Sequence, residues 1–263
     1  MSLTATYRFM RELGLDPRRL RLLTELPRYL YDLRAWRRAG GQITSIYPVL
    51  GDRADQAGSA MNAYFHQDLL VARCIYEAQP RRHIDVGSRI DGFVAHVAVF
   101  RAIEVLDVRP LTSVISNVTF TQADLMADSA ALAGITDSLS CLHALEHFGL
   151  GRYGDTIDPQ GHLRGFQALI NMLTPDGVLY LSFPIGRPVV EFNAHRVFHP
   201  TEVLSWPGSE RLQLQRFDYI DDAGTLHEDV PITSIATACG SVIHGCGIYT
   251  FAIRRDEVWH AAQ

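Results

Sequence analysis

The stretch "RRHIDVGSRIDGFVAHV", residues 81–97, predicts a short β-strand, a tight turn and the start of a helix. Strand, glycine turn and helix form the usual layout of a nucleotide-binding loop, in which backbone N–H groups at a helix N-terminus approach the ligand. Gly87 supplies the turn. The loop nevertheless departs from the common pattern, because Arg89 stands where such loops carry a second glycine and Asp91 where a third can occur.

The bulk composition is that of an ordinary folded protein: of 263 residues, 47% are apolar and 20% are charged. This length suits one catalytic domain with an N-terminal extension. The chain has no run of about 18 apolar residues, and its start lacks the pattern of a signal peptide, so we expect a cytoplasmic protein with no membrane partner. Four cysteines without a C-x-x-C pair argue against a zinc ribbon or a disulfide scaffold.

All 24 basic residues are arginines, since the sequence contains no lysine. Schiff-base catalysis, pyridoxal phosphate attachment and a Walker A phosphate loop each need a lysine amine, which an arginine cannot replace. These three functional classes are therefore excluded.

The charge of the chain is unevenly distributed. The net charge is −5, and residues 1–40 hold nine arginines against four acidic residues, which leaves −10 on the remainder. Nucleic acid is therefore not an expected partner, and we interpret the basic N-terminal stretch as a solvated helix face.

The periodicity of the sequence divides the chain into a helical N-terminal extension, residues 1–79, and a second domain, residues 80–263. Three stretches of the extension have apolar residues at helical spacing: 16–26, 27–39 and 54–77. We expect the extension to cover the ligand site as a lid, to which three ring side chains contribute: Tyr47, Tyr64 and His66.

From residue 80 the pattern changes to short runs rich in apolar and β-branched residues. Five of them alternate with helical or turn-rich stretches: "HIDVG", "AIEVLDV", "NVTFTQADL", "DSLSCLHAL" and "GVLYLSF". This alternation predicts an α/β fold with a parallel sheet and helices on both faces. Two later runs alternate apolar and polar residues, as strands near a sheet edge do: "RLQLQRFDYIDDAG" and "GCGIYTFAIRR".

An acidic residue stands at or near the end of each of the first three predicted strands: Asp85, Asp107 and Asp124. Ligands of open parallel sheets bind at these strand ends, and Asp107 follows Asp85 at close to the spacing at which an acid meets ribose hydroxyls in dinucleotide folds. Unpaired buried carboxylates are costly, which favours a ligand site. Alternatively, the three side chains cap the helices that follow. Arg89 argues against a nicotinamide dinucleotide, whose pyrophosphate needs close backbone approach at that position.

Together with the "LEH" end of the fourth strand and the L-x-P-x-G turn "LTPDG", these features resemble the class I S-adenosylmethionine-dependent methyltransferases over about residues 81–185. The resemblance implies S-adenosylmethionine as cofactor and a Rossmann-like, mostly parallel seven-stranded sheet of order 3-2-1-4-5-7-6. Asp85 and Gly87 would frame the methionine part of the cofactor, Asp107 would accept from the ribose hydroxyls, and Asp124 would meet the adenine amino group. Further residues implied beside the cofactor are Ser88, Val108, Leu125 and His143.

Arg89 is predicted to reach the cofactor carboxylate through charge-assisted hydrogen bonds, although it could instead fill the space that a glycine would leave. A longer set of motifs, "HIDVGSRIDGFVA", "LDVRPL", "LEHFGLGRYGD" and "FNAHRVF", is similar to a narrower group of methyltransferase-like proteins. That group is known as a domain of unknown function and is found among O-antigen, capsule and other surface-polysaccharide genes. The similarity implies a sugar or a sugar nucleotide as the acceptor.

The candidates for catalysis lie in "HALEH", residues 143–147, and after the fifth strand. Methyl transfer to a hydroxyl needs a base, for which His147, supported by Glu146, is the first candidate and His195 the second. Alternatively, the Glu-His pair only fixes its loop through backbone hydrogen bonds. The same letters match the H-x-x-E-H zinc peptidases, but the strand before them and the glycines after them leave no helix to hold two such histidines, so no metal site is expected.

Two loops at the same end of the sheet offer polar side chains to an acceptor. "GLGRYGD" offers Arg152 for phosphate oxygens, Tyr153 for stacking and Asp155 as an acceptor for hydroxyls, unless it is simply a long turn. "FNAHRVF" offers Asn193 and Arg196.

The sequence thus predicts a methyltransferase that modifies a hydroxyl of a small, sugar-derived acceptor. The rival hypothesis is a non-catalytic nucleotide- or sugar-binding protein on the same fold, in which the changed loop has ended methyl transfer. A third hypothesis is a scaffold whose arginine-rich N-terminal helices dock a partner. A Ser-His-Asp hydrolase is discounted because no G-x-S-x-G elbow occurs. Nothing in the sequence indicates an oligomeric state.

Overall fold

The computed structural model describes residues 3–53, 60, 62–127, 130–238 and 245–254. The chain divides into two compact units, residues 1–59 and residues 60–263. Within the described ranges, every helix is too short or too polar to cross a lipid bilayer. Part of the third predicted helix, residues 54–59 and 61, and Cys239 lie outside the described residues.

The first unit contains α1 (Leu3–Glu12), the 3-10 helix η1 (Pro17–Glu25) and α2 (Leu26–Arg38). Helix α1 was not predicted, and the predicted helix over 16–26 is a 3-10 helix. Pro27 lies in the first turn of α2, and Gly40 follows its end with φ +83°. A proline suits the first helical turn because its missing N–H has no intrahelical partner there, and glycine tolerates the left-handed conformation past a helix end.

Helix α3 (Ala63–Ala78) belongs to the second unit, although the sequence analysis placed it in the N-terminal extension. The side chain of Asn62 caps it by accepting the N–H of Tyr64 at 3.0 Å. Its buried residues Leu70 and Ile75 pack in the same core cluster as the strands. The division between the units therefore lies at residues 59/60 and not at 79/80. Helical periodicity revealed the apolar face of α3 but could not show which sheet that face covers.

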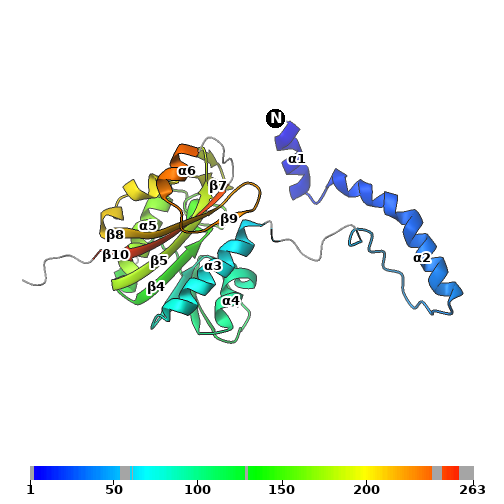
Figure 1. Ribbon diagram of the computed structural model, residues 1–263, viewed down its shortest axis with the longest axis horizontal. Helices are drawn as coiled ribbons and strands as arrows, with labels where there is room; N and C mark the ends of the chain where they lie inside the picture. Colours follow the sequence, from blue (N-terminus) through cyan, green and yellow to red (C-terminus); the bar gives the residue numbers. More distant parts are fainter. Residues whose placement is uncertain (1–2, 54–59, 61, 128–129, 239–244, 255–263) are drawn as a thin grey trace, which may run out of the picture. The chain divides into compact units, whose positions relative to one another are not determined.

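An eight-stranded sheet forms the centre of the second unit, in the order β3-β2-β1-β4-β5-β10-β8-β9 (Figure 1). Its strands are β1 (His83–Val86), β2 (Ile103–Asp107), β3 (Val118–Gln122), β4 (Thr136–Leu142), β5 (Leu173–Ile185), β8 (Leu212–Ile220), β9 (Leu226–His227) and β10 (Gly245–Ile253). Strands β1 to β5 are parallel, and β10 runs antiparallel to both β5 and β8. The Rossmann-like α/β prediction is confirmed, and its seven strands occur in the predicted order. The prediction missed β9, which adds an eighth strand at the edge.

The remaining elements are short or lie on the two faces of the sheet. They are η2 (Ile90–Val94), α4 (Ala95–Ala98), η3 (Ala130–Leu132), η4 (Leu145–His147), α5 (Gly161–Met172), η5 (Glu202–Ser205), η6 (Ser209–Arg211) and α6 (Ile232–Ala238). Strands β6 (Val189–Glu191) and β7 (His195–Val197) form a separate two-stranded sheet. Because successive side chains of a strand point to opposite faces, Leu179 and Leu181 of β5 pack with α5, whereas Tyr180 packs with α3 and α4.

We expect a chain that begins at Ala60 to fold, whereas a chain that begins at Pro80 should be strongly destabilised. The longer chain keeps α3, whose large buried side chains Leu70, Val71 and Ile75 each contribute about 1.5–3 kcal/mol. Their sum is comparable with the whole stability of a domain, about 5–15 kcal/mol. Urea unfolding of both chains beside the full-length protein measures the difference, and equal stabilities would contradict the assignment of α3 to the second unit.

Candidate active site

Two adjoining cavities open at the carboxyl ends of the parallel strands. The smaller one, of about 530 Å³, includes Leu106, Asp107, Val108, Asp124 and Leu125 from the ends of β2 and β3. The larger one, of about 1070 Å³, takes residues from α3, the loop after β1 and the segment after β4. Five residues line both cavities: Gly87, Arg109, His143, His147 and Tyr153.

Asp85 is fully buried at the end of β1 and lines neither cavity. Its carboxylate accepts the backbone N–H and the hydroxyl of Ser88 at 3.0 and 2.7 Å and the hydroxyl of Ser140 at 2.5 Å. Burial raises the pKa of Asp85 to about 6, although these hydrogen bonds act in the opposite direction. Asp85 therefore holds the turn after β1 in place, and the prediction that it frames a ligand directly is corrected to an indirect role.

Gly87 is the one position of this turn that only glycine can occupy. Its φ is +76°, and an added Cβ would lie 2.7 Å from the Cβ of Ala144. The backbone of the turn thereby comes close to both cavities, as the sequence predicted.

Arg89 lines the larger cavity but does not reach across it. Its Nε and Nη2 donate to the two oxygens of Asp91 at 3.0 and 2.8 Å, and the pair is largely exposed. The side chain therefore has a partner two positions along the chain, at the start of η2. Contact of Arg89 with a cofactor carboxylate stays a prediction, and it would require the side chain to leave Asp91.

Asp107 at the end of β2 is held by Arg109, which the sequence analysis did not single out. The backbone N–H and Nε of Arg109 donate to Oδ1 of Asp107 at 2.8 and 2.9 Å, and Nη2 donates to Oδ2 at 2.5 Å. The guanidinium carbon of Arg109 also lies 4.5 Å from the centre of the Tyr153 ring. Asp107 lies where the prediction placed it, but both of its oxygens are engaged.

Asp124 and Leu125 follow β3 and line the smaller cavity with Val108. Oδ1 of Asp124 accepts the N–H of Met126 at 2.9 Å, which fixes the turn. This cavity thus combines apolar walls with three carboxylates, of which Asp107 and Asp124 are the two that the strand-end pattern placed there.

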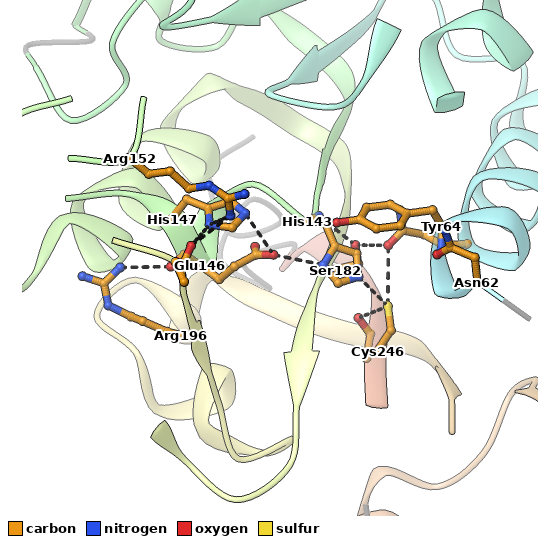
Figure 2. A network of polar contacts seen from close by, with 12 residues as sticks. Asn62, Tyr64, His143, Glu146, His147, Arg152, Ser182, Arg196 and Cys246 are labelled. Carbon is orange, nitrogen blue, oxygen red and sulfur yellow. Dashed lines mark hydrogen bonds and ion pairs between the residues drawn. The ribbon is translucent and has the colours of Figure 1, made fainter. Parts of the chain in front are cut away.

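His143 lines both cavities and contacts Cys246 of strand β10. Its Nδ1 lies 3.0 Å from Oε1 of Glu146 and its Nε2 lies 3.2 Å from the sulfur of Cys246, while the ring packs against Tyr64 (Figure 2). Its backbone has φ +50° and donates to the carbonyl of Ser182. Burial disfavours the imidazolium, but Cys246 and Glu146 outweigh burial and raise the pKa of His143 well above its ordinary value.

His147 lies on the 3-10 helix η4, on the other side of Glu146 (Figure 2). Its Nδ1 lies 2.6 Å from the carbonyl oxygen of Ala194, so Nδ1 is the protonated nitrogen and Nε2 carries the lone pair. Nε2 is 3.7 Å from Oε1 of Glu146. Burial lowers the pKa of His147, so its imidazole is neutral at physiological pH.

Glu146 is itself almost completely buried, with 1% of its surface exposed, and it lines the larger cavity. Within the described part of the chain, its Oε2 has no hydrogen-bond partner. A buried carboxylate oxygen without a partner is costly, which indicates that a polar ligand group or water meets it there.

The turn between β6 and β7 contributes less than predicted. His195 lines the larger cavity, with its ring centre 6.5 Å from that of His147. Asn193 is exposed and lines neither cavity. Arg196 is buried and donates to the carbonyl oxygens of Glu146, Phe148 and Pro159. Asn193 and Arg196 are therefore not brought to the site, and Arg196 supports the segment after β4 instead.

The glycine-rich loop 149–155 is shaped by its own aspartate. Asp155 accepts the N–H groups of Gly149, Gly151 and Tyr153 at 2.9–3.1 Å. Asp155 also lines the smaller cavity, so its role as an acceptor for ligand hydroxyls stays a prediction beside its role in shaping the loop. The loop places Arg152 and Tyr153 on the larger cavity, as predicted.

Substitution of Asp155 by Ala should loosen this loop without unfolding the domain. Three N–H groups would lose their acceptor, each at a cost of about 1 kcal/mol. Hydrogen exchange at Gly149, Gly151 and Tyr153 should accelerate, while exchange in β4 and β5 stays as in the wild type. Unchanged exchange at the three amides would contradict this role.

Four residues of the site escaped the sequence analysis: Gln67, Asp68, Arg109 and Cys246. Gln67 and Asp68 come from the first turns of α3, and their oxygens reach Ser182 and the surroundings of Gly92. The sequence signal that could have identified them is the presence of two polar residues on the otherwise apolar face of α3. Of the predicted lid residues, Tyr64 lines the larger cavity, His66 lines neither cavity, and Tyr47 belongs to the first unit. Among the described residues, no group of three histidine, cysteine or acidic side chains is arranged to hold a metal ion.

Comparison with known families gives one partial match. A family model described as "Caenorhabditis protein of unknown function, DUF268" matches residues 104–228, which is less than half of the chain. Its description states no activity. No curated protein matches the sequence significantly.

Solved structures give a broader match. The 4+2 cyclase SpnF superimposes with a TM-score of 0.52 at 13% identity, over 83% of this chain and 91% of SpnF. A Galdieria sulphuraria protein described as a sarcosine dimethylglycine methyltransferase gives a TM-score of 0.50 at 12% identity, over 72% and 84%. The Burkholderia thailandensis 1,6-didemethyltoxoflavin-N1-methyltransferase, solved with S-adenosylhomocysteine, gives 0.48 at 14% identity, over 78% and 82%. At these identities the likeness concerns the fold alone, and that fold is the Rossmann-like fold of the class I methyltransferases.

Proposed function

We propose that this protein is an S-adenosylmethionine-dependent methyltransferase that modifies a hydroxyl of a small, sugar-derived acceptor. The observation that carries the proposal is the junction of the two cavities. Carboxylates at the ends of β2 and β3 line one cavity, and a neutral histidine beside a buried glutamate stands where the second cavity begins.

We assign the smaller cavity to the adenosine part of the cofactor because of the chemistry of its lining. Its apolar walls, including Val108 and Leu125, suit an adenine ring, Asp124 suits the adenine amino group, and Asp107 suits the ribose hydroxyls. The turn at Gly87 lines both cavities and would lie beside the remainder of the cofactor; an added Cβ there would lie 2.7 Å from the Cβ of Ala144 and would shift the turn. When bound, the cofactor supplies a methyl group on a positively charged sulfur.

His147 is the proposed base. Its Nε2 lone pair is available because Nδ1–H donates to Ala194, and its lowered pKa keeps the imidazole neutral. A proton taken from the acceptor hydroxyl would reside on Nε2, where Glu146 stabilises the imidazolium at 3.7 Å. His195, 6.5 Å away between ring centres, remains the second candidate.

The lining of the larger cavity supports a polar acceptor. It combines amide, carboxylate, phenol and guanidinium groups from Gln67, Asp68, Arg89, Arg152 and Tyr153. Hydroxyl-rich sugars and their phosphates need such mixed donors and acceptors. The resemblance to proteins from surface-polysaccharide gene clusters supports the same class of acceptor and a role in that biosynthesis.

A non-catalytic nucleotide- or sugar-binding protein is the second candidate function. It is favoured by one specific observation, the engagement of both Asp107 oxygens by Arg109. The superposition on a cyclase also shows that this fold is not tied to one activity.

Calorimetry with S-adenosylmethionine and S-adenosylhomocysteine tests the proposal. We expect both to bind, and Asp124→Asn to weaken binding by about 1–3 kcal/mol, because the amide presents a donor where the adenine amino group needs an acceptor. The amide oxygen still caps Met126. Asp176→Asn, an exposed position near the start of β5, is the matched control and should bind as the wild type does. No heat from either ligand would refute the proposed function.

The proposed base makes a second, independent prediction. Long-range 15N–1H spectra of the histidine rings should show His147 protonated at Nδ1, with a pKa below that of an unfolded histidine, because burial disfavours its charged form. As the pH falls, this ring should titrate later than an exposed histidine. His147→Gln assigns the signal, and protonation at Nε2 near neutral pH would exclude His147 as the base.

A further inference from the structure

The contact between Arg109 and Asp107 is unusually complete for residues beside a ligand cavity. Three N–H groups of Arg109 reach the carboxylate at 2.5–2.9 Å, and only 10% of the Asp107 side chain is exposed. Arg109 itself is 43% exposed and lines both cavities. The more exposed partner of the pair thus lies at the junction of the two cavities.

Ribose hydroxyls and this guanidinium would compete for the same oxygens. A carboxylate has about four acceptor sites, and Arg109 uses three of those of Asp107, two on Oδ1 and one on Oδ2, which leaves one site where a diol needs two. A ribose diol that binds Asp107 in the proposed manner therefore has to displace the Arg109 side chain, although the backbone N–H of Arg109 can stay.

The Tyr153 ring can hold the Arg109 side chain after its displacement from Asp107. Arg109 already packs on Tyr153 with its guanidinium carbon 4.5 Å from the ring centre, and Arg152 lies 5.3 Å from the same ring centre. Both guanidinium groups line the larger cavity. A rotation of the Arg109 side chain on this ring, away from Asp107, would place two guanidinium groups beside one ligand.

We propose that Arg109 couples the two cavities. While the cofactor cavity is empty, its guanidinium binds the Asp107 carboxylate. Once a ribose diol takes its place on Asp107, Arg109 and Arg152 together bind a phosphate group of the acceptor. The inference rests on the proposed function and deepens it in two respects. It makes the acceptor a phosphorylated sugar or sugar nucleotide, and it makes cofactor and acceptor bind with positive cooperativity.

The test is calorimetric titration of the full-length protein with S-adenosylhomocysteine. Arg109→Ala should bind this ligand about two- to tenfold more tightly than the wild type, because the competing ion pair is gone. Sodium phosphate should tighten binding to the wild type relative to sodium chloride of equal ionic strength, and should have no such effect on Arg109→Ala.

Arg82→Ala is the matched control. Arg82, which directly precedes β1, forms a similar bidentate pair at 2.6–2.7 Å with Glu104, near the amino end of β2. Its removal should change neither the affinity for S-adenosylhomocysteine nor the effect of phosphate.

The outcomes separate this inference from the function on which it rests. Equal or weaker binding by Arg109→Ala, with the wild type binding normally, would overturn the inference and leave the methyltransferase proposal intact. An effect of phosphate that persists in Arg109→Ala would also overturn it. Absence of binding by both proteins, with both folded, would overturn the proposed function and this inference together.

Discussion

The geometry of the site depends on one buried carboxylate. Asp85 is removed from solvent, its pKa is raised to about 6 by that burial, and three hydrogen bonds from Ser88 and Ser140 compensate for the lost hydration. The bonds from Ser88 close the turn after β1, and the bond from Ser140 ties that turn to β4. Gly87 is thereby held against Ala144, and the floors of both cavities are set by the same interaction.

The sequence predicted the frame of this site well, because strand ends in a parallel sheet are fixed by topology. Once five apolar runs are assigned to parallel strands, their carboxyl ends must meet at one edge, whatever their side chains do. Asp107, Asp124 and His147 were found at that edge for this reason. The edge strand β9 was missed because a pair of only two residues has no periodicity of its own.

Side-chain direction is what the sequence could not provide. Asp155 and Arg196 stand in the predicted loops, yet each is engaged by backbone groups, three N–H groups for Asp155 and three carbonyls for Arg196. Buried backbone groups have to be paired, so a nearby charged side chain is drawn inward before it can serve a ligand. Arg89 and Arg109 illustrate the same point at the surface, since each folds back on a carboxylate two residues away.

Two neighbouring histidines share Glu146, and their pKa values shift in opposite directions. Glu146 lies between them, 3.0 Å from Nδ1 of His143 and 3.7 Å from Nε2 of His147. His143 also has the Cys246 sulfur beside its other nitrogen, and Cys246 and Glu146 together raise its pKa in spite of its burial. For His147, burial lowers the pKa by more than Glu146 and the Ala194 carbonyl raise it, and Arg152 and His143 lower it further. Burial of the ring thus keeps His147 able to accept a proton, while the shared acid stabilises the imidazolium that forms.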